Sequence, residues 1–277
     1  MTDIPTYYTW NNQAFEPIEQ PSAERILVAD SWRVRGGVTW GLADHIHRFV
    51  TGLQARNAPS EVLIAAELET FEVALRRLLY AQWSKAQEDL FPRISLHQDR
   101  GRWRIELVVR PAPQPRDTTS LWIPPYTDPR ACATIKGPDI SLMRGLVAEV
   151  AADDIVLHDG TFVHEATTGA LMVWYSVDHL VLCQASRQLA SISVRRIADY
   201  ARSQGITVTT QPVTLEELVT RKAPVWFSNT LHGISPVTTI GSATGETQVA
   251  AHPDVAQWQA AWWADFADDL GHVRPMR

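Results

Sequence analysis

The sequence contains little of what builds disulfide frameworks, membrane spans or nucleic-acid surfaces. Its 277 residues include two cysteines, Cys132 and Cys183, which give neither a disulfide framework nor the spacing of a metal site. No apolar stretch reaches the roughly 20 residues that a membrane-spanning helix needs, and the first ten residues lack the features of a signal peptide. The net charge of −6 argues against a nucleic-acid or anionic-membrane surface. We therefore expect a cytoplasmic protein that binds no metal, nucleic acid or membrane.

Motifs of several common catalytic classes are also missing. The sequence has no glycine loop of the P-loop or Rossmann kind, no serine-centred nucleophile elbow and no internal repeat. What it does have is ordinary for a soluble globular protein, with 45% hydrophobic and 20% charged residues in a chain long enough for a large core. We expect most of the eleven tryptophans to pack in cores or at an interface. These features alone indicate a soluble α/β (α+β) protein.

Apolar periodicity and prolines indicate two domains. Apolar runs predict strands at 26–29, 93–97 and 104–110, and stripes at helical spacing predict helices at about 44–53, 60–85 and 254–270. Prolines between 111 and 129 break this pattern. We expect a smaller N-terminal α/β domain over 1–123, a linker over 124–134 and a larger C-terminal domain over 135–277. The crevice between two such domains is where ligands tend to bind.

The stretch from Asp153 to Trp174 is the most informative part of the chain. Its Asp159-Gly160 pair lies between two apolar runs, which predicts a β-hairpin. The second strand ends at Glu165, and Thr167, Thr168 and Gly169 come directly after it. Small hydroxyls and flexible backbone suit the close approach of a polar ligand.

Lys136 precedes Gly137 and Pro138 at a predicted junction between a strand and a helix. On its own, a lysine before Gly-Pro would be interpreted as a surface residue. A lysine that forms a Schiff base must instead be held close to an aldehyde carbon and have its pKa depressed by its surroundings. The residues around Lys136 do not decide between these interpretations.

Taken together and in this order, Lys136, the Asp153–Gly160 segment and the Glu165–Thr168 segment resemble the core of the class IV aminotransferases. The resemblance covers about residues 25–240. These fold-type IV pyridoxal-phosphate enzymes include branched-chain and D-amino-acid aminotransferases and 4-amino-4-deoxychorismate lyase. The resemblance implies the fold-type IV fold, pyridoxal 5'-phosphate as cofactor, a small-molecule amino substrate and a homodimer with the site near the subunit interface.

The resemblance also implies roles for single residues. Arg48, in a His-x-x-Arg run that begins at His45, would bind the cofactor phosphate together with Ser193, the backbone at Ile192, and Thr230. The chain has Ser-Ile-Ser at 191–193 where the family usually has Pro-Gly-[Ile/Val]-Thr. Backbone N–H groups at a helix N-terminus suit phosphate, and an ordinary serine cap would use the same groups.

The remaining roles concern the cofactor ring and the substrate. Lys136 would bind the cofactor covalently and act as the general base, and Glu165 would pair with the ring nitrogen. Ser31 stands where the lyase has a threonine implicated in catalysis, Arg110 would bind a substrate carboxylate, and Thr168 would contact substrate. Glu165, Ser31 and Arg110 also have a structural interpretation, as solvated or backbone-bonded residues at the ends of strands.

The run from Asn229 to Val237 resembles the N-[ST]-L-x-G-x-x-P-V run of the lyase branch. Ser141 replaces the tyrosine that branched-chain aminotransferases carry five residues after the lysine. Together with Ser31 and Arg110, these features favour 4-amino-4-deoxychorismate lyase, which eliminates pyruvate to give 4-aminobenzoate. Two alternatives stay open: an aminotransferase acting on a branched-chain or D-amino acid, and a non-catalytic descendant that keeps the fold as a binding or scaffold protein.

Overall fold

The computed structural model describes residues 5–59, 62, 68–99 and 101–270, which form two compact units. The first unit consists of Met1–Pro113, Ile135–Pro138 and Ala267–Arg277, and the second of Gln114–Thr134 and Asp139–Phe266. This division differs in detail from the boundaries expected from sequence. The four residues around Lys136 and the C-terminal segment pack with the first unit, and residues 114–123 pack with the second.

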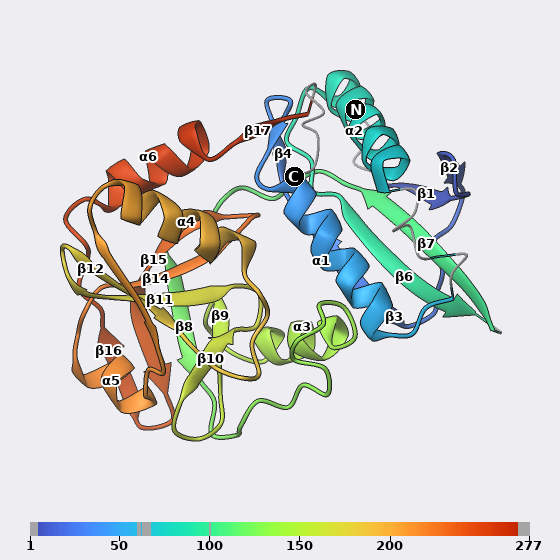
Figure 1. Cartoon of the computed structure of the whole chain (residues 1–277). Coiled ribbons are helices and arrows are strands. Elements are labelled where there is room, and N and C mark those ends of the chain that lie inside the picture. The colour runs from blue at the N-terminus through green and yellow to red at the C-terminus, as the bar shows by residue number, and fades with distance from the viewer. Residues whose placement is uncertain (1–4, 60–61, 63–67, 100, 271–277) are drawn as a thin grey trace. The chain divides into compact units, whose positions relative to one another are not determined.

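The first unit is built on a five-stranded antiparallel sheet in the order β2-β1-β7-β6-β3, with α1 lying along it beside β3 (Figure 1). A three-stranded ribbon in the order β17-β5-β4 completes the unit. The strands are β1 (Thr6–Trp10), β2 (Phe15–Ile18), β3 (Ile26–Ser31), β4 (Val34–Arg35), β5 (Val38–Thr39), β6 (Arg93–Asp99), β7 (Arg102–Val109) and β17 (Asp268–Asp269), and the helices are α1 (Leu42–Ala55) and α2 (Leu68–Ala86). The strands expected at 26–29, 93–97 and 104–110 are confirmed. The helix expected from Ser60 is confirmed from Leu68 onward, and residues 60–61 and 63–67 lie outside the described residues.

Helix α1 packs on β3 because its apolar side chains recur every three or four residues. Leu42, Ile46, Phe49 and Leu53 are each at most 1% exposed. Burying a side chain of this size contributes about 2 kcal/mol. At Gly52 a Cβ would lie 2.5 Å from Val28 Cγ1, so this glycine allows the helix to approach the strand closely.

The second unit is a nine-stranded sheet in the order β10-β9-β8-β15-β14-β11-β12-β13, with β16 paired to β15. β10 and β11 follow each other in the chain but stand far apart in this order. A tight turn joins them, in which Ala166 N donates to Gly169 O at 2.8 Å. The sheet therefore curls. The elements are β8 (Thr119–Ile123), α3 (Ile140–Ala148), β9 (Asp154–His158), β10 (Val163–Ala166), β11 (Ala170–Ser176), β12 (His179–Cys183), α4 (Ile192–Ser203), β13 (Thr207–Gln211), α5 (Leu215–Thr220), β14 (Val225–Asn229), β15 (Gly233–Ser242), β16 (Gly245–Gln248) and α6 (Val255–Asp265).

The hairpin predicted around Asp159-Gly160 is confirmed. β9 and β10 pair antiparallel with Glu165 opposite Leu157, and the Asp159 carboxylate accepts the N–H groups of Thr161 and Phe162 at 2.9 and 2.7 Å. Gly160 has φ +105°, a conformation that glycine adopts without strain. The hairpin positions Glu165 near the end of a fully buried strand.

The C-terminal helix is shorter than the sequence predicts. It ends at Asp265 instead of continuing to Leu270, because Arg196 Nη1 donates to Phe266 O at 2.6 Å and the chain then pairs with β5 as β17. Packing of the aromatic stripe is confirmed. Trp258 contacts Trp174 and Trp226 edge-to-face, and Trp262 contacts Phe266 in the same way.

No helix within the described residues combines the length and the apolar character that crossing a membrane requires.

The turn between β10 and β11 gives a test of close packing in the second unit. At Gly169 an added Cβ would lie 2.5 Å from the Phe227 ring and 2.7 Å from Ser228 O. We expect Gly169→Ala to lower the free energy of unfolding by about 2 kcal/mol or more, since the core has no room for the methyl group. Gly145→Ala, in α3 with open space around it, should raise stability by about 0.5 kcal/mol. Denaturant unfolding of both variants checks this, and equal stabilities would contradict it.

Candidate active site

In the first unit, Arg48 is held by a buried carboxylate. Its Nε and Nη2 donate to Asp30 Oδ2 and Oδ1, each at 2.8 Å, and Asp30 is 0% exposed. His45 Nδ1 lies 2.8 Å from the same Oδ1. Although burial raises the pKa of Asp30, Arg48 and His45 together hold it well below its usual range. The carboxylate is therefore ionised and fixes the plane of the Arg48 guanidinium.

Sequence reasoning singled out Arg48 and missed Asp30. The available signal was a carboxylate at the end of an apolar strand, directly before Ser31. Ser31 N donates to Asp30 Oδ1 at 2.8 Å, so Asp30 also orients the backbone of Ser31. The structure thus brings Ser31 and Arg48 to the same carboxylate.

Lys136 lies beside the same strand. Ala29 N, in β3, donates to Lys136 O at 2.7 Å. Gly137 has φ +134°, and a Cβ there would lie 2.6 Å from Ala29 N, so only glycine permits this approach. The residues before Lys136 are irregular rather than a strand, and α3 begins at Ile140. The strand predicted directly before Lys136 is therefore wrong. Backbone contact with β3 holds this segment instead.

Arg110 directly follows β7. Its Cζ lies 4.7 Å from the centre of the Phe91 ring, and its carbonyl accepts Phe91 N at 2.7 Å. The contact restrains the guanidinium by stacking. The role of Arg110 in binding a substrate carboxylate stays a prediction.

In the second unit, Glu165 is 4% exposed and is held from one side only. Its Oε1 accepts Arg130 Nη1 at 2.7 Å and Leu189 N at 3.1 Å. Its Oε2 accepts no hydrogen bond from the part of the chain that the structure describes. Burial raises the pKa of Glu165, and Arg130 opposes that rise. Arg130 was missed from sequence because it lies in a proline-rich stretch with the composition of a linker.

The start of α4 presents backbone donors. Ser191 is the helix cap, with Oγ accepting Val194 N at 3.3 Å, and Ser193 Oγ lies 3.1 Å from Ser191 Oγ. The cap is thus Ser191, and Ser193 lies in the first turn. The N–H groups of Ile192 and Ser193 have no acceptor within the helix. Both residues are at most 5% exposed, and buried donors at a helix N-terminus suit an anion.

Thr168 and Thr230 are linked through Asn229. Asn229 Nδ2 donates to Thr168 O at 3.0 Å, and Asn229 Oδ1 accepts the N–H groups of the two residues after Thr230 at 3.0 and 2.8 Å. The Thr168 hydroxyl donates to Asp154, which is fully buried. Asp154 and Asn229 thus hold the hydroxyl and the carbonyl oxygen of Thr168. The contact of Thr168 with substrate stays a prediction.

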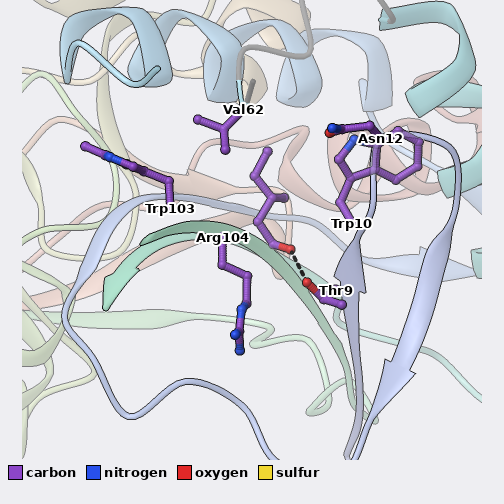
Figure 2. Close-up of a pocket in the computed structure, with 7 residues that line it drawn as sticks. Thr9, Trp10, Asn12, Val62, Trp103 and Arg104 are labelled. Atoms are coloured by element: carbon purple, nitrogen blue, oxygen red, sulfur yellow. Dashed lines mark hydrogen bonds between the residues drawn. The ribbon is translucent and has the colours of Figure 1, made fainter. Parts of the chain in front are cut away.

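A cavity of about 210 Å³ lies elsewhere in the first unit, beside β1 and β7 (Figure 2). Among the lining residues, Thr9 Oγ1 donates to Ile105 O at 3.4 Å. None of the residues predicted to bind cofactor or substrate line it. The lining residues are Thr9, Trp10, Asn12, Val62, Trp103, Arg104 and Ile105.

Residues 27–240 match the family model described as amino-transferase class IV. The chain belongs to this family. Membership confirms the predicted fold class and makes the chain an enzyme that uses pyridoxal phosphate. No match is found among curated protein sequences.

Solved structures with the same fold come from several organisms. A hypothetical aminotransferase from Mycobacterium tuberculosis in its PLP-bound form is 14% identical, with a TM-score of 0.75 over 94% of this chain and 99% of that one. The fold IV-transaminase CpuTA1 from Curtobacterium pusillum is 18% identical, with a TM-score of 0.73 over 97% and 99%. A branched-chain aminotransferase from Thermoproteus uzoniensis with norvaline is 13% identical, with a TM-score of 0.76 over 96% and 95%.

The donors and acceptors in the second unit fit parts of pyridoxal phosphate. Glu165 Oε2 is an open acceptor for a ring N–H, and Ile192 and Ser193 offer buried N–H groups for a phosphate. Lys136 supplies a half-buried amine. The individual roles of these residues stay predictions.

The Asp30–His45 contact gives a pH test of the first unit. Burial lowers the pKa of His45, so below about pH 6.5 the unfolded chain binds a proton that the folded chain does not. Wild-type stability should therefore fall as pH drops from 7.5 to 5.5, by about 1 kcal/mol more than in His45→Gln. His47→Gln, which changes an exposed histidine on the same helix, should keep the wild-type slope. Denaturant unfolding at both pH values checks this, and equal slopes in wild type and His45→Gln would rule it out.

Proposed function

We propose that this enzyme is a 4-amino-4-deoxychorismate lyase, which eliminates pyruvate and releases 4-aminobenzoate. The observation that carries the proposal is the position of Asn229. This residue belongs to the run that resembles the lyase branch. One hydrogen bond, from Nδ2 to Thr168 O, ties it to the turn after Glu165, and two more, accepted by Oδ1, hold the Thr230 loop. Ser31 beside Asp30, and Arg110 at the end of β7, support the same proposal.

Lys136 carries the proton transfer in this proposal. Pyridoxal phosphate, when bound, supplies an aldehyde for the lysine and substrate amines and a ring that withdraws electrons. Lys136 Nζ takes the proton from the substrate carbon that bears nitrogen. Of the three lysines in the chain, Lys85 and Lys222 are exposed and Lys136 is half-buried.

The other residues hold charge in place. Arg48, oriented by Asp30, and the N–H groups at the start of α4 bind phosphate. Glu165 accepts a hydrogen bond from the ring nitrogen at Oε2, the oxygen that the protein leaves open. Arg110 binds a carboxylate of the substrate, since a guanidinium forms two parallel hydrogen bonds with such a group.

The second candidate is an aminotransferase acting on a branched-chain or D-amino acid. The similar solved structures favour it, because they are described as aminotransferases, one of them bound to norvaline and another to alpha-ketoglutarate and PMP. The first proton abstraction by Lys136 is the same in both reactions. The two reactions differ in their later steps, because an aminotransferase needs a keto acid to accept the amino group and a lyase does not.

We also propose that the enzyme is a cytoplasmic homodimer. Family resemblance supports the dimer, and two free cysteines are compatible with a reducing compartment. Light scattering of the purified protein should give twice the 31.0 kDa of one chain.

The cofactor role of Lys136 is tested by absorbance. Wild-type protein with added pyridoxal phosphate should show a yellow absorption band in the visible range that borohydride bleaches, and Lys136→Ala should lack it. Lys85→Ala and Lys222→Ala are matched controls and should keep the band. With three lysines in the chain, mass spectrometry of the reduced protein should place the adduct on the peptide that contains Lys136. No band in the wild type at saturating cofactor would favour the scaffold alternative instead.

The reaction itself is tested by its need for an acceptor. We expect 4-amino-4-deoxychorismate to yield pyruvate and 4-aminobenzoate with no keto acid present, and Lys136→Ala to lose at least about a hundredfold in rate, as removal of a general base predicts. Turnover that requires a keto acid, with a branched-chain or D-amino acid as donor, would show that the second candidate is correct.

A further inference from the structure

Arg130 lies between two buried carboxylates in the second unit. Its Nη1 donates to Glu165 Oε1 at 2.7 Å, and its Nε and Nη2 donate to Asp128 Oδ1 and Oδ2 at 3.0 and 2.9 Å. Arg130 is 8% exposed, Glu165 is 4% exposed, and the Asp128 side chain is 1% exposed. One guanidinium is thus shared between two carboxylates from which water is almost excluded.

The buried cluster of Asp128, Arg130 and Glu165 has a surplus negative charge. Burial raises the pKa of Asp128, but the hydrogen bonds and charge of Arg130 and a hydrogen bond from His164 outweigh it and lower the value to about 2. Asp128 is therefore ionised at neutral pH. Asp128 and Glu165 thus place two carboxyl groups against one buried guanidinium, and in the state in which Glu165 is ionised these three side chains carry a net charge of −1.

Three further groups lie around the cluster. His164 Nδ1 lies 3.1 Å from Asp128 Oδ2, and His164 Nε2 lies 4.0 Å from Asp159, which is 48% exposed. Arg187 Nε lies 3.5 Å from Asp128 Oδ2, but its side chain is 43% exposed, so solvent screens its charge. The exposed Arg187 therefore compensates the negative charge of the cluster less than a buried cation would, and Asp159, itself an anion, does not compensate it.

Within the described residues, a ligand could reach the negative charge of the cluster at Glu165 Oε2. Glu165 Oε1 is occupied by Arg130 and by Leu189 N, and Oε2 accepts nothing from the described residues. If Arg130 served Glu165 alone, the pair would be neutral and would bind a neutral N–H donor nearly as well as a cationic one. Asp128 accepts hydrogen bonds from Nε and Nη2 of Arg130. The positive charge of the guanidinium is therefore shared, and less of it compensates the negative charge of Glu165.

Resting on the proposed function, we propose that Asp128 is a positioning residue that acts through Arg130 and Glu165 to select a cofactor whose ring nitrogen is protonated. An amide has one acceptor oxygen, so it could accept only one of the two hydrogen bonds that Asp128 accepts from Arg130. Burying a second carboxylate costs desolvation free energy, and the charge itself is what an amide could not supply.

The test compares two ligands that differ at one ring atom. Pyridoxal 5'-phosphate and its 1-deaza analogue, in which C–H replaces the ring nitrogen, share the aldehyde and the phosphate. We divide the dissociation constant of the 1-deaza analogue by that of pyridoxal 5'-phosphate. Contributions from Lys136 and from the phosphate-binding groups therefore cancel in this ratio. This ratio reports the interaction of the ring nitrogen with Glu165, and it is measured by titrating the apo protein without any turnover.

Loss of the Asp128 charge should lower the preference for the nitrogen-containing cofactor. We expect Asp128→Asn to reduce the ratio about tenfold, equivalent to one pKa unit of the ring nitrogen. Asp159→Asn removes a carboxylate from the exposed side of His164 and should leave the ratio within about twofold of wild type. Asp128→Glu keeps the charge and should restore most of the preference.

Removing the charge of Arg187 should change the ratio of dissociation constants in the opposite direction. Arg187→Gln removes the exposed cation near Asp128, so the ratio should rise by about twofold to threefold, the size expected for a screened ion pair. A role of Asp128 confined to holding structure predicts no increase in any variant. This measurement stands even if Asp128→Asn does not fold, because it leaves Asp128 in place and changes a side chain that is 43% exposed and whose Nη2 donates to Arg130 O.

The outcomes separate the two proposals. If both ligands bind wild type but Asp128→Asn weakens them equally, or Arg187→Gln leaves the ratio unchanged, the charge role of Asp128 is wrong while the cofactor assignment stands. If wild type binds neither ligand, the proposed function fails and this inference fails with it. A lowered ratio in Asp128→Asn with a raised ratio in Arg187→Gln supports the inference.

Discussion

A buried carboxylate that accepts two nitrogens of one arginine positions the charge in each unit. Asp30 holds Arg48 in the first unit, and Asp128 holds Arg130 in the second. Burying four charges would be costly if they were unpaired, so each pair requires near-ideal geometry. That requirement makes the arginines rigid. A rigid guanidinium can present its remaining donors in a defined direction, which a solvated arginine on a flexible stem cannot do.

Backbone contacts impose a second constraint, and they explain where small residues stand. Gly137 lets the Lys136 segment lie against β3, and Gly169 lets the turn after Glu165 lie against the Phe227 ring. Both glycines lie within four residues of a residue with a predicted role. The fold thus holds Lys136 and Glu165 partly through main-chain contacts that any larger side chain would prevent.

Much of the fold and part of the site could be predicted from sequence. The β9–β10 hairpin followed from Asp159-Gly160, and α1 followed from its apolar stripe, because local chemistry determines both. Lys136 was found only through family resemblance. Arg130 was missed because its partner Glu165 is 35 residues away, and proline-rich chain shows no periodicity that would place either one. The end of α6 was missed because it depends on Arg196, a contact across 70 residues.

The course of the chain through the two units has a consequence for biosynthesis. The chain passes from one unit to the other after Pro113, Thr134, Pro138 and Phe266. The first unit therefore lacks the Lys136 segment until residue 138 is translated, and it lacks β17 until residues 268–269 follow the whole second unit. Domains made of one continuous segment fold as they emerge, whereas here the first unit, although most of it is translated first, is completed last. A truncated nascent chain would expose the ribbon edge of β5 that β17 covers.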